Sequence, residues 1–172
     1  MHVRLILALV GILSLLAVPV AAADHDDPEA SAKGNVHWVI PLPNAFGVEV
    51  GNVLRFKAER DDDGEVEGRL HYEQTVEGET FIFDGKATCL VIYDGNRAKI
   101  GGVITKSNDA TQPPGRFMWF QVFDLGKRKK GPPDRSSLVG FGDEAANEAF
   151  CNSPNLPRFG PWDVIGQIKV RP

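Results

Sequence analysis

Residues 87–107 read ATCLVIYDGNRAKIGGVITKS, and this stretch decides the fold class. An apolar run ends at Tyr93, an Asp-Gly-Asn turn follows, and a second run alternates apolar with polar residues. Asp94 and Gly95 tolerate the positive φ angles that a tight hairpin turn requires. The stretch therefore predicts a β-hairpin.

The same alternation recurs along most of the chain and predicts about seven to eight short strands. We expect these strands at residues 36–40, 53–59, 66–73, 80–93, 97–106, 117–123, 136–141 and 164–170. Residues 144–151 (EAANEAFC) are instead rich in helix formers, which indicates one short helix near the C-terminus. The fold class is thus all-β, with a single antiparallel β-barrel or a β-sandwich as the architecture. The mid-strand pair Gly101-Gly102 favours the barrel, because a bulge or a barrel corner accommodates glycine.

Residues 1–23 have the composition of a secretory signal peptide. Arg4 is positively charged, residues 5–20 are almost entirely apolar, and Ala21-Ala22-Ala23 offers small residues for cleavage. A membrane anchor is the alternative, but the apolar run is shorter than the roughly 20 residues of a spanning helix. We expect a secreted protein with no membrane span in the mature chain. Residues 24–34 would form a flexible leader, and residues 35–172 one β domain.

The net charge argues about the class of partner, and the cysteine content indicates a crosslink. The formal net charge is −4, from 19 Lys and Arg against 23 Asp and Glu, which argues against nucleic acid as a partner. Cys89 and Cys151 are the two cysteines of the chain. An even pair in an exported protein predicts one disulfide, with two buried thiols as the alternative. Closure of so long a loop would contribute roughly 4 kcal/mol to stability.

A set of aromatic and amide side chains forms the first candidate site. Phe117, Trp119, Gln121 and Phe123 share one face of an expected strand, and Tyr93 ends a neighbouring strand. In a small barrel such residues usually fill the interior. If the interior is underfilled, they would instead line an apolar pocket in which Gln121 orients a small ligand.

A basic cluster forms the second candidate site. Lys127, Arg128, Lys129 and Lys130 lie between glycines in residues 126–135 (GKRKKGPPDR). Four adjacent cations can bind phosphate, sulfate or an anionic polymer. The alternative is a solvated loop that keeps a sheet edge soluble.

Catalytic and metal-binding patterns are weak in this sequence. It has no Gly-x-Ser-x-Gly motif, and His71 lies on the charged face of the strand expected at 66–73, where it is a surface residue or, alternatively, a general base. The acidic turn 59–67 (ERDDDGEVE) lacks the terminal Glu of an EF-hand loop. We expect no catalytic residue, no cofactor and no metal.

Part of the chain resembles a family of small secreted bacterial proteins of unknown function. The shared pattern is Thr88-Cys89-Leu90, then Gly95-Asn96, then residues 101–105 (GGVIT), then Pro132-Pro133-Asp134. The resemblance implies a β architecture and export, and it carries no activity. The cations at residues 127–130 depart from the neutral or acidic loop of that family.

The favoured function is a secreted, non-catalytic binding or structural module whose ligand is unknown, and the candidate partners are a small apolar ligand and an anionic surface polymer. One alternative is a barrel enzyme of the cyclase or isomerase type, which needs an interior cavity and a polar group such as Gln121 or Tyr93. The other is a surface module that binds anionic polymers through the basic loop.

Overall fold

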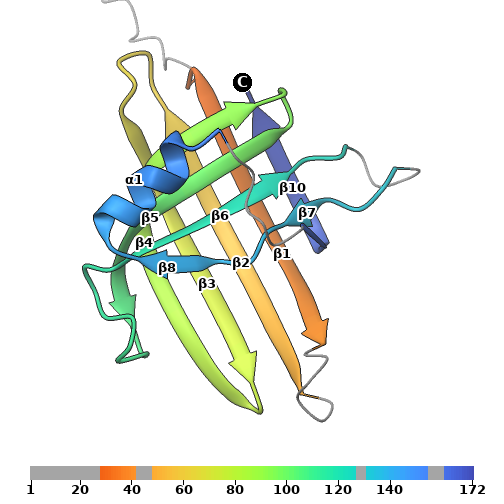
Figure 1. Cartoon of the computed structure of the whole chain (residues 1–172). Coiled ribbons are helices and arrows are strands. Elements are labelled where there is room, and N and C mark those ends of the chain that lie inside the picture. Colours follow the sequence, from red (N-terminus) through yellow and green to blue (C-terminus); the bar gives the residue numbers. More distant parts are fainter. Residues whose placement is uncertain (1–27, 42–47, 127–130, 155–160) are drawn as a thin grey trace, which may run out of the picture.

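The computed structural model describes residues 28–41, 48–126, 131–154 and 161–172. Within these ranges the chain forms one ten-stranded sheet and one helix (Figure 1). The strands are β1 (Ala30–Pro41), β2 (Glu49–Arg60), β3 (Val66–Val76), β4 (Glu79–Tyr93), β5 (Arg97–Ser107), β6 (Phe117–Phe123), β7 (Arg135–Ser136), β8 (Gly140–Gly142), β9 (Trp162–Asp163) and β10 (Ile165–Arg171), and the helix is α1 (Glu144–Asn152). None of the described helical residues form a segment both long and apolar enough to cross a membrane.

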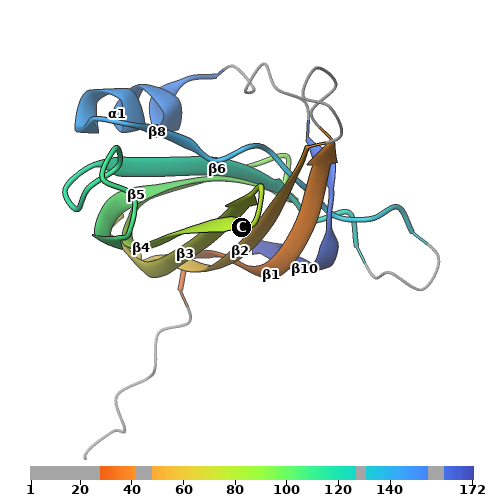
Figure 2. The same cartoon turned by 90° about the horizontal axis from the view of Figure 1, so that it is seen from below.

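The strands are joined as antiparallel neighbours in the order β10-β1-β2-β3-β4-β5-β6-β7-β9, with β8 beside β6. Seen end-on, they curl into a nearly closed barrel, and α1 lies outside it against β5 and β6 (Figure 2). The expected all-β barrel class is confirmed. The described strands number ten rather than seven to eight, because the single strand expected at residues 136–141 is divided into two short strands, β7 and β8, and β9 has only two residues, too few to show an alternating pattern.

The first strand begins earlier than the sequence indicates. Residues 30–34 were expected in the flexible leader, but they belong to β1 and pair with β2, and from Ser31 also with β10. Ala30 and Ala32 are buried in the core. Small and polar residues gave no hydrophobic alternation here, yet small side chains are what a tightly packed strand end accommodates.

The C-terminal strands close the barrel, and two carboxylates complete the closure. One residue separates β9 from β10; β9 pairs with β7 and β10 pairs with β1. On the other side of β10, Asp134 Oδ2 accepts a hydrogen bond from the N–H of Ile168 at 2.8 Å, and Asp124 Oδ2 accepts one from Val170 at 3.1 Å. Asp134 is only 1% exposed, and the charge-assisted bonds that it accepts from the N–H groups of Ile168 and Leu125 compensate for burying its carboxylate.

Inward-facing side chains fill the barrel. The largest fully buried ones include Tyr72, Phe120, Leu54, Leu70, Ile100, Ile104, Met118 and Ile168. Phe56 and Phe120 pack edge to face, with ring centroids 5.2 Å apart. These rings and branched aliphatic chains form a packed core.

A disulfide fixes α1 to the outside of the barrel. It joins Cys89 in β4 to Cys151 in α1, as predicted, and closes a loop of 62 residues. Gly101 permits this approach, because a Cβ at that position would lie 2.1 Å from Asn147 Oδ1. The bulge expected at Gly101-Gly102 occurs on the opposing strand, where the register shifts between Ala87 and Cys89.

Candidate functional site

The first candidate site of the sequence lies on the outer side of the barrel. Met118, Phe120 and Val122 of β6 point into the core, so Phe117, Trp119, Gln121 and Phe123 project outward toward α1. Trp119 stacks on Phe150 of α1 with ring centroids 6.1 Å apart, and Arg97 lies over the Phe123 ring at 5.2 Å. The five predicted pocket residues thus share a face with the helix instead of lining the interior.

The alternation of side chains along β6 explains why these residues face α1 and not the barrel interior. Both faces of β6 are apolar, one toward the barrel and one toward α1, so the sequence could not distinguish them. Tyr93, at the end of β4, pairs with Arg97 of β5, which pairs with Phe123, so it joins the same outer surface. Burial raises the pKa of Tyr93 to about 12, a shift that nearby Arg97 partly opposes. Whether these residues bind a ligand stays a prediction.

The basic loop of Lys127, Arg128, Lys129 and Lys130 lies outside the described residues. Its predicted binding of anions therefore stays a prediction.

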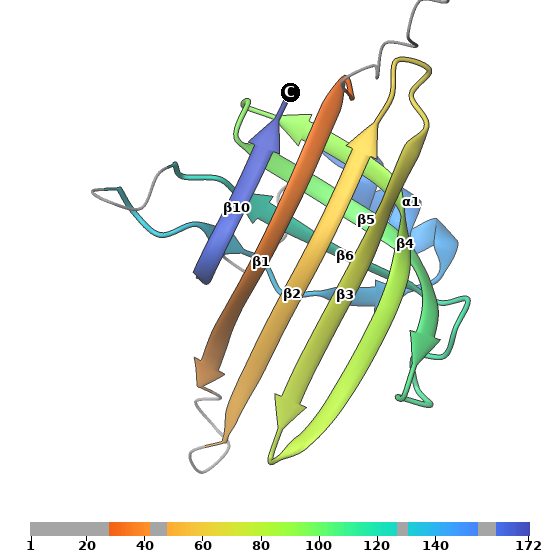
Figure 3. The ribbon, with the colours of Figure 1, turned by 180° about the vertical axis from the view of Figure 1, so that it is seen from behind.

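A different group of cations comes together on the outer face of the sheet. Lys169 of β10 is in register with Lys33 of β1, Lys33 with Lys57 of β2, Lys57 with Arg69 of β3, and Arg69 with Lys86 of β4. We call these five residues the basic row. Directly paired residues point to the same side of a sheet, and all five are exposed. The basic row crosses five adjacent strands, which lie side by side in Figure 3.

The basic row is unusual because like charges face one another on every pair of strands. Directly opposed like charges destabilise a sheet. Among the described residues, Lys57 alone of the five has an ion-pair partner, the carboxylate of Glu59 at 2.7 Å. The net charge of the whole chain is −4, so the basic row is a local concentration of positive charge in an acidic protein. Positive charge is therefore concentrated in one row, of which Lys57 alone is neutralised by an ion pair among the described residues.

Two adjoining grooves contain the whole row. The first, of about 840 Å³, is lined by Lys33, Lys57, Lys169, the amides of Asn35 and Gln167, and Gly34, Phe56 and Gly166. We call it the amide groove; it has no carboxylate in its lining. The second, the histidine groove, measures about 1000 Å³ and includes Lys57, Arg69, Lys86 and His71 in its lining. Because Lys57 lines both grooves, they form one track along the row.

His71 is held between two carboxylates in the histidine groove. Its Nδ1 lies 2.7 Å from Asp84 Oδ1 and its Nε2 lies 2.7 Å from Glu73 Oε1. Burial lowers the pKa of His71, but the hydrogen bonds and charges of these carboxylates outweigh that effect and raise it. Glu73 also pairs with Arg55 at 3.3 Å. Both ring nitrogens are engaged by carboxylates, so the imidazole is not available as a general base.

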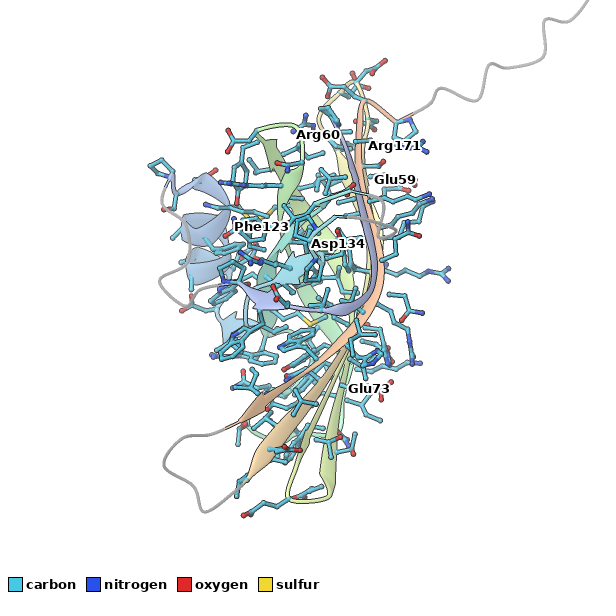
Figure 4. All side chains as sticks on the ribbon, turned by 90° about the vertical axis from the view of Figure 1, so that its right-hand side faces the viewer. Glu59, Arg60, Glu73, Phe123, Asp134 and Arg171 are labelled. Atoms are coloured by element: carbon cyan, nitrogen blue, oxygen red, sulfur yellow. A yellow bond between two sulfur atoms is a disulfide. The ribbon has the colours of Figure 1, made fainter. Side chains whose placement is uncertain are left out.

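Acidic side chains border the basic row on both sides. Glu59 and Glu67 are paired across β2 and β3, two residues along each strand from Lys57 and Arg69. Figure 4 shows Glu59, Arg171 and Glu73 along this outer side, whereas Phe123 lies on the side of α1 and Asp134 between them. The track is therefore a narrow line of positive charge with acceptor groups beside it.

The sequence contained a partial signal for this site. Lys57 and Arg69 alternate with apolar residues in the two strands expected to share a wet face. Lys33 falls within the leader that the sequence predicts, and no local pattern relates it to Lys169, which lies at the other end of the domain. Only the pairing of β1 with both β2 and β10 aligns them.

Comparison of the chain with known protein families, with curated proteins and with solved structures finds no match. The resemblance to small secreted bacterial proteins therefore stays a prediction. Among the described residues, no group of three or more His, Cys, Asp and Glu side chains is arranged to hold a metal ion.

Proposed function

We propose that this protein is a secreted, non-catalytic binding module that holds an extended anionic polymer across the outer face of β10, β1, β2, β3 and β4. The basic row carries the proposal, since five exposed cations in register match a linear array of negative charges. A folded protein gains no stability from such an arrangement, so a binding role accounts for it. The disulfide is compatible with the predicted export.

A binding role also agrees with the rest of the molecule. The enzyme alternative requires an interior cavity, whereas large side chains such as Tyr72, Phe120 and Met118 are fully buried in the barrel. His71, the one candidate general base of the sequence, has both nitrogens bonded to carboxylates. These observations favour recognition over chemistry.

Binding to soluble polyanions at several salt concentrations tests the proposal. The probes are polygalacturonate, heparin and polyphosphate, measured by biolayer interferometry on the mature protein. The row variant Lys33→Gln/Lys57→Gln/Lys169→Gln should lose roughly 10- to 100-fold in affinity for whichever polyanion binds, from three exposed charge contacts of about 0.5–1 kcal/mol each.

The matched comparison is a loop variant in which Lys127, Arg128, Lys129 and Lys130 are all replaced by Gln. It should keep binding within about threefold if the row is the site. Loss of binding in the loop variant alone would transfer the function to the basic loop. Absence of polyanion binding by the wild-type protein would refute the proposal.

A further inference from the structure

We infer that the polymer is an acidic polysaccharide with one carboxylate per sugar ring, that is, a polyuronate. This inference rests on the proposed function and adds the chemical class of the ligand. It follows from the spacing of the cations, from the groups that border them and from the composition of this face.

The spacing of the cations in the basic row indicates how far apart the negative charges of a matching ligand should lie. Neighbouring strands lie about 4.8 Å apart, so the row offers one cation at each such interval. A pyranose ring linked through its 1 and 4 positions has nearly this length. A polyuronate laid across the strands would therefore carry its carboxylates at an interval similar to that of Lys169, Lys33, Lys57, Arg69 and Lys86, whose long, flexible side chains can reach carboxylates on either side of the sugar chain.

The borders of the row require hydrogen-bond donors on the ligand. Glu59 and Glu67 lie on one side and Asp84 on the other, and ionised carboxylates only accept hydrogen bonds. Sugar hydroxyls can donate to them. Polyphosphate has no such donors, and its additional charge would be repelled by these carboxylates. The borders thus select a narrow polyanion that carries hydroxyls.

The amide groove contributes groups that suit the same ligand. Asn35 and Gln167 are directly paired across β1 and β10, next to the pair Lys33 and Lys169. Each amide both donates and accepts hydrogen bonds, as sugar hydroxyls do. Three cations and two amides without a carboxylate make this groove the most favourable place for a uronate residue.

The face lacks the groups that recognise nucleic acid strands. Within the described part of the chain, the outward positions bordering the row are occupied by Gln167, Asn35, Arg55, His71, Asp84, Arg171, Ser31, Glu59 and Glu67. None is a Phe, Tyr or Trp on which a base could stack, and stacking is the main attraction of single-stranded binding sites apart from charge. The observations therefore favour an acidic polysaccharide.

The test compares probes that differ in one property each. Polygalacturonate is measured against its fully methyl-esterified form, which removes the charge, and against polyphosphate and single-stranded DNA, which remove the sugar hydroxyls or rearrange the charge. Polygalacturonate should bind at least about tenfold more tightly than each of them, because charge-assisted hydrogen bonds to the row combine with hydroxyl contacts at its borders.

Two double variants test how the residues that border the basic row contribute to binding. Asn35→Ala/Gln167→Ala should weaken polygalacturonate binding about three- to tenfold while leaving the salt dependence unchanged, since no charge is removed. Glu59→Gln/Glu67→Gln should improve polyphosphate binding about fivefold or more, because it removes the repulsion. Thermal unfolding of each variant verifies that it is folded.

The outcomes distinguish a failure of the polyuronate inference from a failure of the proposed function. If polyphosphate, heparin or DNA binds as tightly as polygalacturonate through the basic row, the inference is wrong and the proposed function stands. If the methyl-esterified polymer binds equally well, charge is not what is recognised and the inference also fails. If none of these polyanions binds, both fail.

Discussion

Replacing Lys33 by Gln should make the protein more stable and its binding of polyanions weaker. Lys33 is the second cation of the basic row and stands between Lys57 and Lys169 on the neighbouring strands. The substitution removes one charge from an exposed position and creates no cavity. Opposite effects on stability and affinity are the signature of a residue that is kept for binding.

The size of the stability gain follows from the spacing. Two unit charges about 5 Å apart repel by about 0.8 kcal/mol in water, and screening at physiological salt lowers this to about 0.4 kcal/mol. Lys33 has two such neighbours, and the flexible side chains can move apart. We therefore expect the free energy of unfolding to rise by about 0.3–0.8 kcal/mol.

The loss of affinity should be about three- to fivefold, since one exposed charge contact contributes roughly 0.5–1 kcal/mol. The slope of log affinity against log salt should fall by about a fifth, because one of five cations is removed. Arg171→Gln is the matched control: it removes the same charge from β10, two residues from Lys169 and outside the row. It should lower the affinity less than Lys33→Gln does.

Urea denaturation measures the stability, since guanidinium chloride would screen the charges under study. Biolayer interferometry with polygalacturonate measures affinity at three salt concentrations. If Lys33→Gln destabilises the protein, the predicted repulsion is absent. If it binds like the wild type, or no worse than Arg171→Gln, the basic row is not the binding site.

Three further perturbations test the fold and the histidine groove. Cys89→Ala/Cys151→Ala should lower the free energy of unfolding by roughly 4 kcal/mol in urea, through the loop of 62 residues that the disulfide closes; a loss under about 1 kcal/mol would contradict this account. Asp134→Ala should cost about 2–4 kcal/mol by the same measurement, because backbone donors at the barrel closure lose a buried acceptor, and unchanged stability would show that water replaces it. His71 has a raised pKa in the folded state, so its stabilising effect is complete below pH 6.5 and is lost as the pH rises through that raised value. His71→Gln should therefore remove this decline from a profile of stability against pH, and a variant that still shows it would place its origin elsewhere.

Local sequence patterns were sufficient to predict the fold class. The turn at Asp94 and Gly95 joins β4 and β5 as predicted, and Asp94 has a positive φ of 54°. The two cysteines form the predicted disulfide. Both features depend on short-range chemistry or on composition, which can be read without knowing which distant segments meet.

The face of each apolar strand could not be predicted in the same way. Phe117–Phe123 is hydrophobic on both sides because it separates the barrel core from α1. The sequence therefore did not indicate which of its side chains face the core and which face the helix. Asp134 likewise gave no sign of its role, since it becomes buried only where β10 closes the barrel.

The sequence by itself determined an all-β chain, a hairpin at residues 94–95 and a crosslink between Cys89 and Cys151, because side-chain alternation, turn chemistry and cysteine number are local properties. Tertiary structure decided the candidate site. Lys33, Lys57 and Lys169 become neighbours only through the register of β1 with two strands, one of which comes from the far end of the chain. A shift of one residue in either pairing would turn these cations to opposite faces, so the strand register of the closed barrel creates the basic row.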